Sequence, residues 1–211
     1  MILAINIVIS VLAAYLIGAL PTSYIMARIF KGVDIRDHGS GNVGATNVLR
    51  VVGKLPALVT LIIDIAKGAL VVTMVAPYGH QFLPELDYEF YRILLGFCAI
   101  TGHIWTVFLR FKGGKGVATT IGVLATLAPS IFIPSIIIWL VVFMITQYVS
   151  VASLAFGIAL PLFSIILNRS IYMVIFAVTL CILNSYKHRS NIKRLIRGEE
   201  PKTILRNVGD V

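Results

Sequence analysis

The stretch ILAINIVISVLAAYLIGALPTSYIMA, residues 2–27, contains no charged side chain. A helix of about 20 apolar residues crosses the hydrocarbon core of a bilayer, which is about 30 Å thick, so this stretch is long enough for a membrane span. No basic residue precedes it, and no convincing small-residue cleavage site follows it. We therefore expect a retained first span rather than a signal peptide that is removed.

Further apolar runs of this kind recur along the chain as far as Tyr186, separated by polar loops. The 211 residues are 58% hydrophobic and only 13% charged, whereas a soluble domain carries about 25% charged residues. A water-soluble core of this length would leave much of that apolar surface in contact with water. The sequence therefore predicts an all-α, polytopic transmembrane bundle that forms a single domain over residues 1–211.

Basic residues gather in two loops and in the tail, and they account for the formal net charge of +9. Orientation in the membrane, anionic lipid and anionic substrates explain this charge better than nucleic acid, because no separate soluble domain carries it. By the positive-inside rule all three regions are cytoplasmic. Their basic residues are Arg28, Lys31, Arg36, Arg50 and Lys54; Arg110, Lys112 and Lys115; and Lys187, Arg189, Lys193, Arg194, Arg197, Lys202 and Arg206.

The number of spans depends on the segment that follows Lys115. As a helix, residues 116–128 would extend only about 20 Å, and Pro129 predicts a break after them. If this short segment crosses, the chain has seven spans, with its N-terminus outside and its C-terminus in the cytoplasm. If residues 116–147 form one bent unit that does not cross twice, the count is five.

The first basic loop contains GSGNVGATNVLR, residues 39–50. Glycines let backbone N–H groups approach an oxyanion, Ser and Asn side chains add donors, and Arg50 supplies a planar fork. This pattern predicts a phosphate-binding loop. A helix-capping turn with Ser40 or Asn42 as the cap is an equally good interpretation of the same residues.

The second basic loop contains GHIWTVFLRFKGGKGVATT, residues 102–120, in which GGKG leads directly into the short helix. Backbone N–H groups and the positive end of a helix dipole would then lie beside Lys112 and Lys115 and favour an anion. The spacing is not that of a Walker A loop, which would need Gly at position 109 and Ser or Thr at position 116. The alternative is that both lysines contact lipid headgroups.

The third polar motif, NSYKHRSNIKRLIRGEE at residues 184–200, follows the last span. If the helix continues, His188 and Asn191 share one of its faces, although a basic juxtamembrane helix is more often a lipid anchor. Ser150 and Ser153 are expected near the same cytoplasmic side. Within the second span, Asp64 and Lys67 lie three residues apart and are predicted to pair as structural support, which we favour over a direct catalytic role. His103, in the third span, is either a polar brace or a substrate contact.

Taken together, these residues resemble the PlsY family of bacterial acyl-phosphate:glycerol-3-phosphate acyltransferases. The resemblance covers nearly the whole chain. It rests on SGNVGATN with Arg50 downstream, the spacing of Asp64, Lys67 and Gly68, GHxxxxFLxFKGGKGVAT, and HRSNIxRLxxGxE. It implies a multi-pass enzyme of the bacterial cytoplasmic membrane, with its active site facing the cytoplasm, that transfers a fatty acyl group from acyl phosphate to the 1-hydroxyl of sn-glycerol 3-phosphate. The products would be 1-acyl-glycerol 3-phosphate (lysophosphatidic acid) and phosphate, in phospholipid biosynthesis, without a cofactor or metal.

The resemblance also implies roles for individual residues. Catalytic roles would fall to Ser40, Arg50, Lys112, Lys115, His188 and Asn191, of which the last two would bind or orient glycerol 3-phosphate. Contacts to substrate or phosphate would come from Gly41, Asn42, Gly44, Asn47, His103, Gly113, Gly114, Gly116, Ser150 and Ser153. Backbone N–H groups of the Gly-rich loops would stabilise the oxyanion of the tetrahedral intermediate.

Two questions stay open on the residues themselves. His188 is surrounded by Arg and Lys residues that lower its basicity, so we favour a substrate phosphate as the proton acceptor. An acyl-serine at Ser40, Ser150 or Ser153 is less favoured, because none of them has an evident adjacent base and orienting acid. The rival function is a transporter of a phosphorylated solute, although the sequence shows no pair of matching halves.

Overall fold

The computed structural model describes residues 2–203, which form helices, turns and loops without a β-strand. The predicted all-α class is therefore confirmed. The chain divides into two compact units, Met1–Pro129 and Ser130–Val211. The single domain over residues 1–211 stays a prediction, and Arg206 of the basic tail lies outside the described residues.

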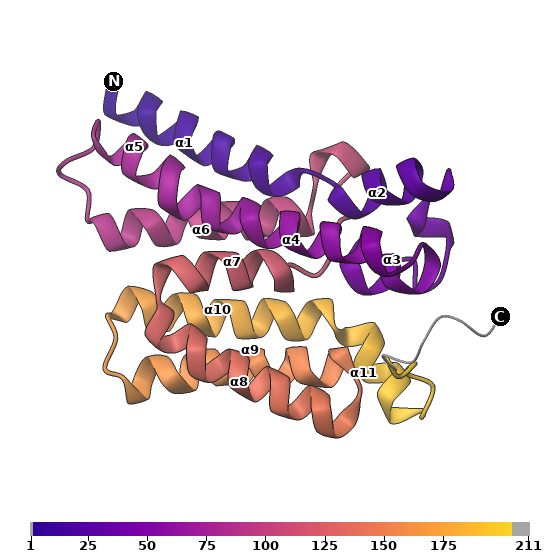
Figure 1. Cartoon of the computed structure of the whole chain (residues 1–211). Helices are drawn as coiled ribbons and strands as arrows, with labels where there is room; N and C mark the ends of the chain where they lie inside the picture. Colours follow the sequence, from indigo (N-terminus) through magenta and orange to yellow (C-terminus); the bar gives the residue numbers. More distant parts are fainter. Residues whose placement is uncertain (1, 204–211) are drawn as a thin grey trace. The chain divides into compact units, whose positions relative to one another are not determined.

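Unit 1 carries both Gly-rich loops and the Asp64–Lys67 pair. Its helices are α1 (Ile2–Ala19), α2 (Thr22–Lys31), α3 (Ala45–Val51), α4 (Lys54–Leu70), α5 (Ala76–His80), α6 (Tyr88–Ile104) and α7 (Val117–Leu127) (Figure 1). Two 3-10 turns, η1 (Ile35–Asp37) and η3 (Val107–Leu109), lie in the loops, and a π-helical segment, η2 (Val71–Val75), joins α4 to α5.

Glycines allow the helices of unit 1 to pack closely. A Cβ on Gly18 of α1 would overlap the backbone of Ala99, and one on Gly102 of α6 would overlap the backbone of Tyr15. The α4–α7 pair uses the same device at Gly68 and Gly122. Small residues at such contacts let helix backbones approach one another in a membrane, where van der Waals packing replaces much of the hydrophobic effect.

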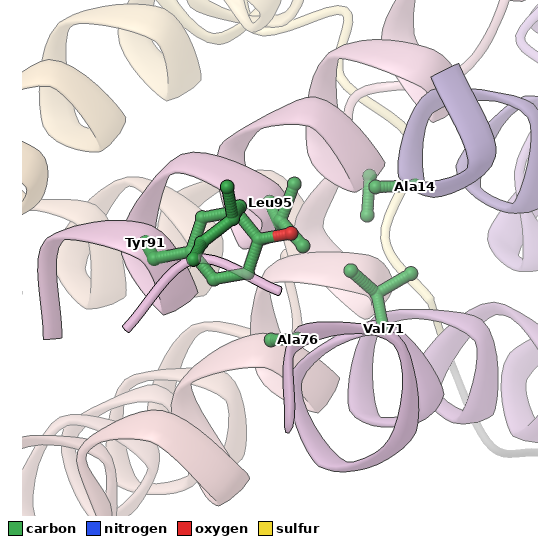
Figure 2. Close-up of a cluster of buried hydrophobic side chains, with 7 residues drawn as sticks. Ala14, Val71, Ala76, Tyr91 and Leu95 are labelled. Atoms are coloured by element: carbon green, nitrogen blue, oxygen red, sulfur yellow. The ribbon is translucent and has the colours of Figure 1, made fainter. Parts of the chain in front are cut away.

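The same helices enclose a cluster of fully buried apolar side chains. Figure 2 shows Tyr91 and Leu95 of α6 beside Ala14 of α1, with Val71 of the π-helical segment and Ala76 of α5. All five side chains are completely inaccessible to solvent. This core holds α1, α5 and α6 together, so the loops that follow α1 and α6 start from fixed positions.

Unit 2 carries the third polar motif. Its helices are α8 (Pro129–Thr146), which begins at the boundary, α9 (Val149–Ile166), α10 (Ile171–Lys187) and α11 (Arg189–Ile196). The predicted break at Pro129 is confirmed, because α7 ends at Leu127 and α8 starts at the proline. Helices α9 and α10 pack side by side. Between α10 and α11 the chain bends by 56°.

Five helices in the described part of the chain are long and apolar enough to cross a membrane, or six if α10 and α11 together form one bent span. Many large apolar side chains on these helices are exposed, among them Ile145, Ile158 and Ile175, as lipid-facing surfaces require. The apolar helix α7 has 11 residues and extends only about 16 Å. The count of seven spans and the orientation therefore stay predictions.

Candidate functional site

The first Gly-rich loop is organised by the side chain of Asn47, which is 1% exposed. Its Oδ1 accepts a hydrogen bond from the Ser40 amide at 2.9 Å, and its Nδ2 donates to the carbonyls of Ile35 and His38 at 3.2 and 3.0 Å. The Asn47 amide is thus engaged within the protein, where we had predicted a phosphate contact. The N-cap of α3 is Gly44, so the capping interpretation with Ser40 or Asn42 was wrong.

The predicted phosphate ligands of this loop lie around the Asn47 centre. Ser40 and Arg50 have exposed side chains, and Asn42 is half-buried. The amides of Gly41 and Gly44 donate to the carbonyls of His38 and Asn42 respectively. Any contact of this loop with a phosphate therefore falls mainly to the side chains and not to these two glycine amides.

Two other basic residues at the start of the loop are held by a carboxylate. Arg36 forms a two-pronged ion pair with Asp34, with Nε–Oδ1 and Nη2–Oδ2 distances of 3.0 and 2.6 Å. These hydrogen bonds lower the pKa of Asp34 to about 2. Arg28 approaches the same carboxylate at 3.6 Å, and both guanidinium groups lie over the ring of Tyr24. We therefore do not add Arg28 or Arg36 to the phosphate-binding set.

The second Gly-rich loop folds back onto the end of α6. The amides of Gly113 and Gly114 donate to the carbonyls of Ile104 and His103, each at 3.1 Å. Gly116 then adopts a φ of 85° and precedes α7, so GGKG leads into this helix as predicted. The amides at positions 113 and 114 are occupied, and the N–H groups of the first turn of α7 have no carbonyl partner within the helix. Any backbone contribution to anion binding therefore falls to that turn, beside the half-buried Lys115 and the exposed Lys112.

The two Gly-rich loops meet at Gly114. A Cβ at this position would overlap the Nε2 atom of His103 and would lie 2.5 Å from the carbonyl oxygen of Val43, which belongs to the first loop. Only glycine lets the backbone approach both groups. The structure thus brings the first and second motifs together within unit 1, although 71 residues separate Val43 from Gly114 in the sequence.

Beneath this meeting point lies a buried polar network. Lys67 Nζ is 2.9 Å from Asp64 Oδ1, 2.9 Å from His103 Nδ1 and 3.2 Å from the carbonyl oxygen of Leu20. The predicted pairing of Asp64 with Lys67 is confirmed. Because an ammonium group only donates, His103 Nδ1 is the acceptor and Nε2 carries the hydrogen. These contacts make His103 a brace between the ion pair and the loop at Gly114.

In unit 2, a carboxylate that we did not select from the sequence joins two predicted site residues. Glu200 Oε1 accepts hydrogen bonds from Ser150 Oγ at 2.8 Å and from Asn191 Nδ2 at 2.7 Å, while Arg194 Nε donates to Oε2 at 2.7 Å. Glu200 is 7% exposed. Burial acts to raise its pKa, but the hydrogen bonds from Asn191, Ser150 and Arg194 outweigh that effect and hold the pKa below its ordinary value.

His188 lies at the bend between α10 and α11 and is 2% exposed. The helix does not continue unbroken to Asn191, so the predicted shared face is replaced by a bend that buries both side chains. His188 Nδ1 is 2.9 Å from the carbonyl oxygen of Asn184. Since a carbonyl only accepts, Nδ1 carries the hydrogen, and in the neutral ring Nε2 is the acceptor nitrogen.

Ser153 is engaged within unit 2. Its hydroxyl donates to the Val149 carbonyl at 2.7 Å and accepts a hydrogen bond from Trp139 Nε1 at 3.3 Å. Its own carbonyl accepts from Asn184 Nδ2 at 2.7 Å. These hydrogen bonds hold Ser153 in place, and its predicted contact with the substrate stays a prediction.

Comparison with known proteins identifies the family. A family model described as glycerol-3-phosphate acyltransferase matches residues 8–198. The chain belongs to the glycerol-3-phosphate acyltransferase family. The glycerol-3-phosphate acyltransferase of Desulforudis audaxviator is 42% identical over 92% of this chain and 93% of its own length. That of Shouchella clausii is 40% identical over 94% of this chain and 96% of its own.

Solved structures agree with this family. PlsY (YgiH), an integral membrane glycerol 3-phosphate acyltransferase, has a crystal structure in its glycerol 3-phosphate form that is 35% identical to this chain, with a TM-score of 0.83. The alignment covers 93% of this chain and 94% of that one. The lysophosphatidic acid form of the same protein has a TM-score of 0.80. The resemblance inferred from the sequence motifs is therefore confirmed.

Proposed function

We propose that this glycerol-3-phosphate acyltransferase takes its acyl group from an acyl phosphate and transfers it to the 1-hydroxyl of sn-glycerol 3-phosphate. The carbonyl carbon forms a bond to the hydroxyl oxygen, and its bond to the phosphate oxygen breaks. The products are lysophosphatidic acid and inorganic phosphate. The family match supports the acceptor, and every relative named above is an acyltransferase, which favours this function over transport of a phosphorylated solute.

The meeting of the two Gly-rich loops at Gly114 carries the proposal most directly, because these two loops are the ones that bear cationic and polar side chains suited to phosphate. Arg50, Lys112 and Lys115 supply positively charged hydrogen-bond donors, and Ser40 and Asn42 add neutral hydrogen-bond donors. Both substrates carry phosphate, and one also carries a long apolar chain. The exposed apolar faces of the spans suit a substrate that enters from the lipid.

His188 and Asn191 are proposed to bind or orient glycerol 3-phosphate. The Nδ1 hydrogen bond of His188 and the hydrogen bond of Asn191 to Glu200 fix both side chains. His188 Nε2, as the acceptor nitrogen, suits a hydrogen bond from a substrate hydroxyl. We propose that a substrate phosphate takes the hydroxyl proton, so that transfer is direct and no acyl-enzyme forms.

We also propose that the chain is a multi-pass protein of the bacterial cytoplasmic membrane, with seven spans, its N-terminus outside and its catalytic residues on the cytoplasmic side. The basic residues of the first loop, the second loop and the tail support this orientation. The bent pair α10 and α11 and the short helix α7 would supply the two spans beyond the five long ones.

The proposed acyl donor is tested by comparing two donors in the same assay. Purified protein is incubated with radiolabelled glycerol 3-phosphate and either palmitoyl phosphate or palmitoyl-CoA, and the lipid product is separated and identified. We expect labelled lysophosphatidic acid, acylated at position 1, with palmitoyl phosphate alone. Product with palmitoyl-CoA but not with palmitoyl phosphate would contradict the proposed donor.

A further inference from the structure

A small pocket lies in unit 1 where α1 ends and α2 begins. Its walls include Ser23 of α2, His103 at the end of α6, Thr106 at the N-cap of η3, Val43 of the first Gly-rich loop and Gly114 of the second. Its free volume of about 10 Å³ is about what one water molecule, or one oxygen atom of a larger ligand, requires. The pocket therefore adjoins the point where the two phosphate-binding motifs meet.

Ser23 brings an unsatisfied hydroxyl to this pocket. The side chain is 1% exposed, and its Oγ has no hydrogen-bond partner among the residues that the structure describes. Buried hydroxyls are nearly always hydrogen-bonded, because an unmade bond costs about 1–3 kcal/mol. Such a group at the wall of a cavity calls for a partner that enters the cavity.

The other polar side chains at the pocket are already engaged. Thr106 Oγ1 donates to the Ala19 carbonyl at 2.5 Å, Thr22 Oγ1 contacts the Leu20 carbonyl at 3.5 Å, and His103 Nδ1 accepts from Lys67. These bonds hold the walls in place. They also leave Ser23 as the side chain best placed to bind an entering atom.

The backbone near Ser23 favours an atom that accepts hydrogen bonds. Helix α2 has ten residues, and Ser23 lies in its first turn, where the helix dipole is positive. The amides of Thr22 and Ile25 in this turn donate to the carbonyls of Leu20 and Pro21, so the Ser23 hydroxyl is the donor on which the site depends. The remaining walls are apolar and include Ala19, Leu20 and Pro21. Donors at one end and apolar walls around them suit an oxygen that belongs to an amphipathic molecule rather than a fully solvated ion.

We propose that this pocket binds one oxygen atom of the acyl-phosphate substrate, and that Ser23 Oγ donates a hydrogen bond to it. The inference rests on the proposed function, since it assumes an acyl-phosphate donor. The oxygen is either the acyl carbonyl or a phosphoryl oxygen, which are both hydrogen-bond acceptors. Ser23 is thereby a further substrate-binding residue, outside the three motifs recognised in the sequence.

The experiment compares Ser23→Ala with wild-type protein and with Ser164→Ala. Ser164 is the matched control because it is buried in α9 and its hydroxyl donates to the Leu160 carbonyl at 2.8 Å. For Ser23→Ala we expect kcat/KM for palmitoyl phosphate to fall by about tenfold or more, with KM for glycerol 3-phosphate and the melting temperature in detergent unchanged. Ser164→Ala should keep wild-type kinetics.

Whether kcat or KM for palmitoyl phosphate changes identifies which substrate oxygen Ser23 binds. A lower kcat with unchanged KM for palmitoyl phosphate indicates the carbonyl oxygen, whose charge develops in the transition state, whereas a higher KM with unchanged kcat indicates a phosphoryl oxygen. Ser23→Cys keeps the side-chain shape but donates weakly. It should show the same loss, and it replaces the alanine variant if that protein does not fold.

Two results would overturn the inference. Wild-type kinetics in Ser23→Ala, with or without a change in melting temperature, would show that the pocket holds only a structural water. A wild-type protein that forms no lysophosphatidic acid from palmitoyl phosphate would overturn the proposed function and this inference together. An active wild type with unaffected Ser23 variants would overturn this inference alone.

Discussion

Each unit of the molecule contains one buried carboxylate that holds predicted site residues, but the two carboxylates obtain their partners in different ways. Asp64 pairs with Lys67, its neighbour three residues along α4, and both side chains are at most 3% exposed. Glu200 binds Ser150, which lies 50 residues away, and its cationic partner Arg194 is 31% exposed. Asp64 belongs to a dry ion pair inside a span, whereas Glu200 belongs to a network of hydrogen bonds near the tail.

This difference determines how much free energy of folding is lost when each network is broken. A buried charge that loses its partner costs about 3–5 kcal/mol, because neither water nor another ion can replace the lost contact. The loss of a partner costs less when the carboxylate lies beside a partly exposed residue, because water can then reach it. We therefore expect stability to depend more on the Asp64 network than on the Glu200 network.

The largest effect is expected from Lys67→Met, which removes the ammonium group that lies 2.9 Å from Asp64 Oδ1 inside a span and leaves this carboxylate with a longer contact of 3.7 Å to His103 Nδ1. We expect the free energy of unfolding in detergent to fall by about 3–5 kcal/mol, together with loss of activity as His103 loses its hydrogen bond from Lys67. The double variant Asp64→Leu/Lys67→Met should recover much of the stability, since apolar replacement of both partners is often close to neutral. Equal stability of Lys67→Met and wild type would show that the ion pair does not stabilise the fold.

A smaller effect is expected from Glu200→Gln, which weakens the hydrogen bonds that position Ser150 and Asn191. We expect unfolding to become easier by about 1–3 kcal/mol, and activity to fall as Asn191 loses its anchor. Glu199→Gln is the control, because Glu199 is exposed and should behave as wild type. A Glu200→Gln protein with wild-type stability and activity would contradict the assigned role.

The stabilities of the Glu199→Gln and Glu200→Gln variants should depend differently on pH in the acidic range. The pKa of folded Glu200 lies below its ordinary value of 4.5, so its contribution to stability is complete above about pH 4.5 and is lost as the pH falls through the folded pKa. Wild type and Glu199→Gln should lose this contribution on acidification. Glu200→Gln, which has no carboxyl group at this position, should show a flatter dependence of melting temperature on pH in that range.

The features that could be predicted from the sequence are local ones. The Asp64–Lys67 pair follows from the geometry of one helix turn, and the break at Pro129 follows from the missing N–H of proline. The entry of GGKG into α7 needs only adjacent residues. In each of these cases the partners lie within four residues of one another, so spacing alone carries the information.

The features that were missed depend on contacts between distant segments. Glu200 meets Ser150 only because the chain returns after α11, and Asn47 is occupied because the loop folds around its amide. The bend at His188 involves neither proline nor glycine, so the residue types there do not predict a bend. Ser23 lies in an apolar run, and only the folded structure brings it to a pocket beside Gly114.

Unit 1 is also expected to bind phosphate through the cationic side chains of its two Gly-rich loops. We expect Arg50→Ala and Lys115→Ala each to lower kcat/KM by roughly tenfold to a hundredfold, since a hydrogen bond to a charged group contributes about 1.5–3 kcal/mol. Lys54→Ala is the matched control, because Lys54 is exposed at the start of α4. Near wild-type turnover in both folded variants would show that these side chains do not hold phosphate.

The proposed orientation places the second basic loop and the basic tail on the cytoplasmic side of the membrane. In a protein freed of Cys98 and Cys181, single cysteines at the exposed positions 112 and 193 should react with an impermeant reagent only after permeabilisation, with no expected loss of folding. A cysteine at position 85, in the connection between α5 and α6 that the proposed orientation places outside, should react in intact cells. The opposite pattern at positions 112 and 193 would place the motifs outside and contradict the proposed orientation.

Direct acyl transfer is tested by incubating the protein with radiolabelled palmitoyl phosphate in the absence of an acceptor. After denaturation the protein should carry no covalent label, and addition of glycerol 3-phosphate should yield labelled lysophosphatidic acid. Ser40→Ala, Ser150→Ala and Ser153→Ala should retain measurable turnover, because each removes a hydroxyl and not a nucleophile. A stoichiometric acyl-enzyme, absent in one inactive serine variant that still binds both substrates, would contradict direct transfer.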